Sequence, residues 1–224
     1  MILIIRGHVR NSFENDNLYN LVKSIYDIEN NVKIYIHTWN IFANNISWRY
    51  LEENTCIISE DFIYDYFKNL RHLIKDLIID DDTNIELVGK LNGNIGTSNM
   101  PLLGWKNYWY GKYKIVKHIY EKGTNLDDVV VNFRFDILEN SNSQLFSDII
   151  NFVQNNKEKN NIKKNIFLND YEFNGLDNIY IGNMYTMYKL THLFHYFVDD
   201  FLAQDNFIYH QEHLVFRINE QLFM

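Results

Sequence analysis

The sequence holds one cysteine, one proline and nine glycines in 224 residues. Cys56 has no second cysteine in the chain to form a disulfide or a thiolate zinc site, so we expect a reducing compartment. Positive charge is also scarce, because 21 Lys and Arg stand against 29 Asp and Glu, a formal net charge of −8. Proteins that bind nucleic acid generally need the opposite balance, so nucleic acid is not an expected partner.

Long apolar runs are missing as well. The opening run, Met1–Ile5, is far shorter than the roughly 20 residues needed to cross a bilayer. Arg6 and His8 follow too early for the apolar part of a secretory signal. The excess of Asn, Ile, Lys, Tyr and Phe is typical of an A/T-rich bacterial or viral genome. We therefore expect a cytoplasmic protein, in a bacterial cell or a virus-infected host cell, without a transmembrane segment and at most peripheral to a membrane.

The sequence has enough apolar and aromatic residues for one packed domain over residues 1–224. Hydrophobic residues make up 46% and aromatic residues 16%, which excludes a disordered chain. The apolar spacing predicts strands at 1–5, 33–37, 85–88, 128–135, 166–168 and 178–181, and helices at 15–29, 61–79, 105–121, 184–202 and 212–220. Strands that alternate with helices in this way predict an α/β fold with a mostly parallel sheet.

The strongest candidate site is Arg134-Phe135-Asp136, at the carboxyl end of the strand predicted at 128–135. Ligands of open α/β sheets bind beyond the carboxyl ends of the strands. Side chains alternate along a strand, so Arg134 and Asp136 project to the same side. Arginine binds phosphate oxygens and aspartate holds Mg²⁺ or Mn²⁺, so the pair suits a phosphate ligand with a divalent metal ion. The alternative is a local ion pair that closes the end of the strand.

A second candidate site follows the first two predicted strands. Arg6, Gly7 and Arg10 come after the first strand, where a glycine lets the backbone approach a ligand and arginines neutralise a diphosphate. Thr38 and Trp39 end the second strand at the same edge of the sheet, where the Trp39 ring is placed to lie against a nucleobase. The alternatives are a chance spacing of two arginines and a tryptophan that belongs to the core.

Three other acidic clusters are interpreted as solvated surface. Asp80-Asp81-Asp82 follows a predicted helix and precedes a predicted strand, which puts it at the end of the sheet opposite the ligand site. Asp127-Asp128 precedes its strand and is therefore also expected at the end of the sheet opposite the ligand site. Asp199-Asp200 is expected at an exposed helix end.

Together with Arg134-Phe135-Asp136, several short segments resemble the GT-A-fold glycosyltransferases. The resemblance is to the bacterial and viral polysaccharide-synthesis enzymes whose motif strand ends in Arg-x-Asp rather than Asp-x-Asp. It touches most of the chain. The other segments that carry it are Arg6–Arg10, His37–Trp39, Trp105–Lys117, Asp177–Gly182 followed by Met187, and Gln211–Leu214.

The resemblance implies a GT-A-like domain that moves a sugar from a UDP- or GDP-sugar to a glycan or lipid-linked acceptor in polysaccharide biosynthesis. It implies nucleotide binding in the half at about 1–136 and acceptor binding at about 137–224. By residue match, Asp136 holds Mn²⁺ or Mg²⁺, and Glu212 or Asp177 accepts the acceptor's proton if the enzyme inverts, with Glu212 preferred. The residues implied in nucleotide and diphosphate binding are Arg6, Gly7, Arg10, Thr38, Trp39 and Arg134.

One departure from the family pattern leaves the metal dependence open. Arg134 stands where the usual motif has its first aspartate, so Asp136 alone would hold the ion at this site. His210 and His213 are candidates for a further ligand, although a His-x-x-His pair more often forms an ordinary helix face.

Two other functions remain as alternatives. A catalytically inactive binding or interaction protein would keep the same strands, because a fold does not fix a function. A sugar-phosphate nucleotidyltransferase would be expected to carry a glycine-rich basic loop after the first strand, and Arg6–Arg10 contains one glycine.

Overall fold

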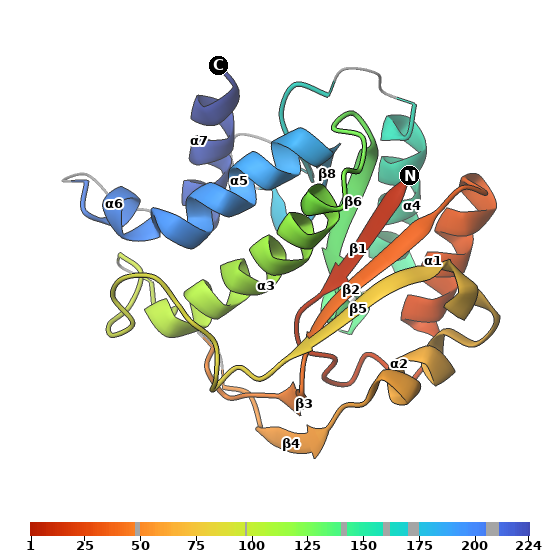
Figure 1. The fold of residues 1–224 in the computed structure, drawn as a ribbon, viewed down its shortest axis with the longest axis horizontal. Coiled ribbons are helices and arrows are strands. Elements are labelled where there is room, and N and C mark those ends of the chain that lie inside the picture. The colour runs from red at the N-terminus through yellow and green to blue at the C-terminus, as the bar shows by residue number, and fades with distance from the viewer. Residues whose placement is uncertain (48–49, 97, 140–142, 159–161, 170–174, 205–210) are drawn as a thin grey trace.

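A computed structural model places the chain around a six-stranded sheet with helices on both faces (Figure 1). The structure describes residues 1–47, 50–96, 98–139, 143–158, 162–169, 175–204 and 211–224. The strand order is β5-β2-β1-β6-β8-β7; the first four strands are parallel, and β8 is antiparallel to both neighbours. The predicted α/β class and mostly parallel sheet are confirmed. The strands are β1 (Ile2–Arg6), β2 (Lys33–Trp39), β5 (Ile74–Asp80), β6 (Val129–Arg134), β7 (Ile166–Leu168) and β8 (Leu176–Asn183).

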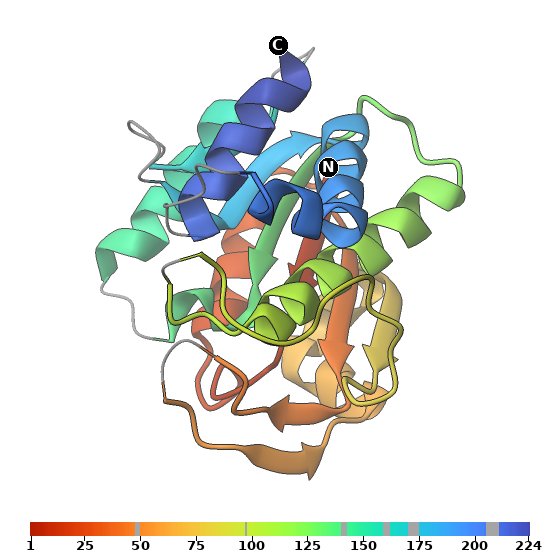
Figure 2. The same cartoon turned by 90° about the vertical axis from the view of Figure 1, so that its left-hand side faces the viewer.

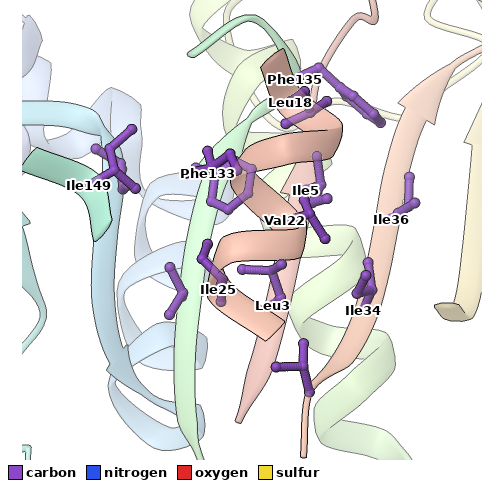
Figure 3. Close-up of a cluster of buried hydrophobic side chains, with 14 of the residues drawn as sticks. Leu3, Ile5, Leu18, Val22, Ile25, Ile34, Ile36, Phe133, Phe135 and Ile149 are labelled. Carbon is purple, nitrogen blue, oxygen red and sulfur yellow. The ribbon is translucent and has the colours of Figure 1, made fainter. Parts of the chain in front are cut away.

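Helices cover both faces of the sheet because its central strands are apolar on both sides. Leu3 and Ile5 of β1 face one side, where Figure 3 shows them beside Val22 of α1, and the alternate residues Ile2 and Ile4 belong to the core of the other side. Burying each such side chain contributes about 1.5–3 kcal/mol. On the Leu3 face lie α1 (Asn17–Ile28), α2 (Glu60–Phe67) and α4 (Ser143–Asn156), and on the other α3 (Leu102–Glu121), α5 (Met184–Tyr196) and α7 (Gln211–Phe223).

The helix predicted at 61–79 is wrong in its second half. α2 ends at Phe67. The next residue, Lys68, has a φ of +50°, outside the helical region, and begins a 3₁₀ segment over Lys68–Leu73. The chain then enters β5, which pairs in parallel with β2. The apolar spacing in this isoleucine-rich stretch fits a helix as well as a strand. The stretch forms a strand because it pairs with β2, which is distant in sequence.

This correction moves Asp80-Asp81-Asp82 to the opposite end of the sheet. Because β5 is parallel to β2, Asp80 lies at the carboxyl edge, in register with Trp39. The strand predicted at 85–88 does not form, and residues 81–96 are loop apart from an isolated bridge between Asn94 and Pro101. The prediction that this acidic cluster lies away from the ligand site is therefore wrong.

Other elements are absent from the predictions or divided differently. α4 occupies a segment to which the apolar spacing assigned no element, and the helix predicted at 184–202 is interrupted at Phe197, after which α6 covers Val198–Leu202. The short strands β3 (Ile41–Ala43) and β4 (Asn54–Ile57) lie beyond the carboxyl edge of the large sheet (Figure 2). The remaining predicted helices and strands are confirmed within a few residues. None of the helices in the described ranges is long and apolar enough to span a membrane.

Acidification is expected to destabilise the fold through His195, which stacks on Tyr113 of α3 with ring centroids 4.6 Å apart. Burial, reinforced by His192 and Lys117, lowers the pKa of His195 from 6.5 to about 4. Between these values the unfolded chain binds more protons than the folded one, so the free energy of unfolding falls as the pH drops through that window. Urea midpoints at about pH 7.5 and pH 5 measure this loss, which His195→Gln should reduce. An equal loss in both proteins would show that His195 is not its source.

Candidate active site

The carboxyl ends of four parallel strands meet at one edge of the sheet, and a cavity of about 190 Å³ opens there. Arg6 at the end of β1 is in register with Arg134 at the end of β6. Strand β8 runs the other way, so its first residues reach the same edge. The cavity thus brings together most of the site residues predicted from the sequence, namely Arg6, Gly7, Arg10, Trp39, Arg134, Asp177 and Glu212.

Arg6 is the most deeply buried charged residue of the cavity lining, with 1% of its surface exposed. Its Nε donates a hydrogen bond to Asn132 Oδ1 at 3.0 Å, and Nη2 donates to the Tyr108 hydroxyl at 3.2 Å and to the Asn178 carbonyl at 3.4 Å. Its Nη1 is buried without a hydrogen-bond partner. All of these contacts are neutral, so the charge of Arg6 has no carboxylate against it in the described part of the chain. Burying a cation of this kind costs free energy unless an anion lies against it.

Arg134 and Arg10 share one carboxylate. The side chain of Asp136 is 5% exposed, and its Oδ2 accepts a hydrogen bond from Arg134 Nη2 and lies 3.2 Å from Arg10 Nη1. Arg134 Nη1 also donates to Asn178 Oδ1 at 3.3 Å. Both arginines line the cavity, whereas Asp136 lies behind them and is not among its lining residues.

The loop after β1 is shaped by backbone contacts. Gly7 has a φ of +97°, a conformation that L side chains rarely adopt, and its amide donates to the His37 carbonyl at 3.1 Å. Thr38 is fully buried, and its hydroxyl donates to the Gly7 carbonyl at 3.0 Å. Thr38 therefore supports the loop from beneath and is not among the residues that line the cavity.

Trp39 belongs to both the core and the cavity. It is 3% exposed, and its ring stacks on Tyr110 and lies near His8, with centroids 5.9 and 5.8 Å apart. His8 also lies 3.8 Å from Asp82, which accepts a hydrogen bond from Asn44. Burial lowers the pKa of His8 below 6.5. The sequence predictions missed His8 and Asn44 as lining residues, because their place depends on the position of β5 and its acidic end.

Tyr108 connects α3 to the start of β8. Its hydroxyl lies 3.1 Å from the backbone carbonyl of Asp177, from Asp177 Oδ2 and from Asn178 Oδ1, and it also accepts the hydrogen bond from Arg6.

Lys112, one turn later on α3, is completely buried, and its ammonium lies over the rings of Tyr108 and Trp109 at 4.0 and 3.9 Å. In the sequence, the signal that identifies these residues is the alternation of aromatic and basic side chains over Trp105–Lys117.

The two predicted catalytic carboxylates differ in exposure. Asp177 is 4% exposed and held by Tyr108, whereas Glu212 lies exposed in the first turn of α7. Both line the cavity. The contact with Tyr108 fixes Asp177 in position, and the side chain of Glu212 is accessible from solvent.

The surroundings of Asp136 do not suit a divalent metal ion. Mg²⁺ and similar ions take several oxygen ligands. Here one carboxylate is paired with two guanidinium groups, and no group of three or more His, Cys, Asp or Glu with metal-binding geometry occurs among the described residues. His213 is half-buried on α7, and His210 lies outside the described residues. The assignment of Asp136 as a metal ligand stays a prediction.

The topology and the edge cavity define an α/β protein with a mainly parallel sheet and a candidate ligand site at the carboxyl edge of that sheet. The chain is similar to the crystal structure of the galactosyltransferase LgtC in complex with donor and acceptor sugar analogues, with a TM-score of 0.47 and 9% identity over 100% of this chain and 70% of that one. An active-site mutant of LgtC gives a TM-score of 0.45 and 10% identity with the same coverage. No protein-family model matches the sequence, and no curated protein matches it.

Proposed function

We propose that the protein is a glycosyltransferase that uses a nucleotide diphosphate sugar, a UDP- or GDP-sugar, as donor. Its acceptor is a glycan or lipid-linked glycan of polysaccharide biosynthesis. The observation that carries the proposal is Arg6, a buried guanidinium with an unpartnered nitrogen in a cavity at the carboxyl edge of the sheet. Such a nitrogen requires an acceptor, and the oxygens of a diphosphate supply it together with the missing negative charge.

The arginines suit the charge that develops during transfer. As the bond between the sugar and the diphosphate breaks, negative charge builds up on the departing phosphate oxygen. Arg6, Arg10 and Arg134 all line the cavity. Donors fixed in advance around this charge stabilise the transition state without having to reorganise.

Glu212 is the better placed of the two carboxylates to accept a proton. In an inverting reaction the acceptor hydroxyl loses its proton to a carboxylate as its oxygen attacks the sugar carbon. Glu212 is exposed at the rim, where an acceptor enters from solvent, and Asp177 is buried against Tyr108. Glu212 therefore accepts the proton of the acceptor hydroxyl, and Asp177 accepts a hydrogen bond from a hydroxyl of the donor sugar.

Mn²⁺ or Mg²⁺ on Asp136 is the remaining part of the function expected from the sequence. When bound, such an ion would neutralise the leaving diphosphate. Because the surroundings of Asp136 do not fit it, the proposed transfer uses only groups of the chain itself.

A screen of nucleotide sugars tests the proposed function. We expect a UDP- or GDP-sugar to raise the thermal midpoint, because a ligand that binds only the folded state stabilises it. The same compound should be hydrolysed slowly to the nucleoside diphosphate when no acceptor is present. The matching sugar-1-phosphate, which lacks the nucleoside, is the control. If no nucleotide sugar shifts the midpoint and none is hydrolysed, the function is not that of a glycosyltransferase.

A further inference from the structure

We propose that the donor diphosphate is bound by Arg6, Arg10 and Arg134 without a divalent metal ion, and that Asp136 is a positioning residue for two of these arginines. This inference rests on the proposed function and deepens it. In this proposal Asp136 is not a metal ligand, and its carboxylate acts only by holding Arg10 and Arg134 in place.

The position of Asp136 supports this assignment. A carboxylate that holds a metal ion against the phosphates has to face the cavity, but the side chain of Asp136 is 5% exposed and is not among the groups that line the cavity. Its Oδ2 contacts the guanidinium groups of both Arg10 and Arg134. A divalent cation on this oxygen would displace both groups or lie against them, and two like charges in so dry a place repel strongly.

Cationic side chains already line the place proposed for the diphosphate. Among the described residues that line the cavity, the arginines are Arg6, Arg10 and Arg134, and the carboxylates are Asp177 and Glu212. The diphosphate of a nucleotide sugar is a diester with two negative charges, and guanidinium groups bind phosphate oxygens with charge-assisted hydrogen bonds.

The backbone of the Arg10 loop is fixed in a way that serves this role. Arg10 has a φ of +53°, which is uncommon for a residue with a side chain, and its amide donates to the Phe42 carbonyl at 2.9 Å. Strained conformations persist where the surroundings hold them and occur most often at functional sites. Asp136 fixes the guanidinium group of Arg10 as well, through the ion pair, and so holds this group beside that of Arg134.

Calorimetric titration of UDP and GDP, each in EDTA and in Mn²⁺, tests the inference. For the nucleotide that binds, we expect dissociation constants within roughly threefold of each other in the two buffers. Asp136→Asn should weaken binding about tenfold in both buffers, because the arginines lose their charged partner. Asp136→Glu should restore part of this loss, since a carboxylate in place suffices. Asp200→Asn, at an exposed position of α6, is the matched control and should bind like the wild type.

The possible results separate this inference from the proposed function. Binding that requires Mn²⁺ in the wild type, and that Asp136→Asn abolishes, would overturn the inference and leave the glycosyltransferase intact. The absence of binding in either buffer, with a folded wild-type protein, would instead overturn the proposed function. A thermal midpoint of Asp136→Asn near that of the wild type excludes unfolding as the cause of weaker binding.

Discussion

Replacing Arg6 with methionine is expected to weaken nucleoside diphosphate binding roughly 30- to 150-fold, or ~2–3 kcal/mol, the value of a hydrogen bond with a charged partner. The side chain is buried, and its free Nη1 lies where the phosphates are proposed to bind. The stability of the fold should change little, because removing a buried charge without an anion offsets the loss of its three neutral hydrogen bonds. Titration calorimetry and a thermal scan of the same preparation measure both effects.

Two variants control this experiment. Arg6→Lys keeps the charge but not the geometry of the guanidinium, so it should bind with an intermediate affinity. Arg71→Met removes an exposed arginine on the 3₁₀ segment, away from the cavity, and should bind like the wild type. Equal affinities of the wild type and Arg6→Met would mean that the anion lies elsewhere.

Glu212→Gln is expected to lower kcat by about 10²- to 10⁴-fold, the usual contribution of a general base, with little change in the KM for the donor. Glutamine keeps the size of the side chain and cannot accept a proton. Glu212 is exposed in the first turn of α7 and lines the cavity, so its change should leave the core unaffected. Initial rates at saturating and limiting donor separate the two parameters.

Glu220→Gln is the matched control on the same helix. It removes an exposed ion pair with Lys164, which contributes little, and should leave the rate unchanged. Asp177→Asn is expected to differ from Glu212→Gln by raising the KM for the donor, because Asp177 is assigned to a donor hydroxyl. If Asp177→Asn lowers kcat alone and Glu212→Gln has no effect, the roles of the two carboxylates are reversed.

Local sequence was sufficient to predict the elements that are strongly apolar or strongly periodic. The run Met1–Ile5 and the valines of β6 predict buried strands, and α1 shows a clear helical repeat. The prediction for the segment at 74–80 was wrong because its apolar residues fit the repeat of a helix as well as that of a strand. Its state is decided by hydrogen bonds to β2, more than thirty residues earlier in the chain, and no local pattern contains that information.

The candidate site shows the same division. Arg6, Arg134 and Trp39 follow apolar strands directly, so their place at the carboxyl edge could be predicted from the sequence. His8 and Asn44 could not, because their contacts run to Asp82 at the end of the misassigned strand. The pairing of Asp136 with Arg10 could not be predicted either, since 126 residues separate them and only the parallel pairing of β1 and β6 brings them together.

The central claim is that the cavity beside Arg6 receives the diphosphate of a nucleotide sugar, and a crystal structure of the protein soaked with UDP or GDP tests it most directly. We predict phosphate oxygens within hydrogen-bond distance of Arg6 Nη1, with Arg10 and Arg134 on the same group and Asp136 still behind them. A nucleotide bound at another place, or phosphates that leave Arg6 Nη1 without a partner, would contradict the account.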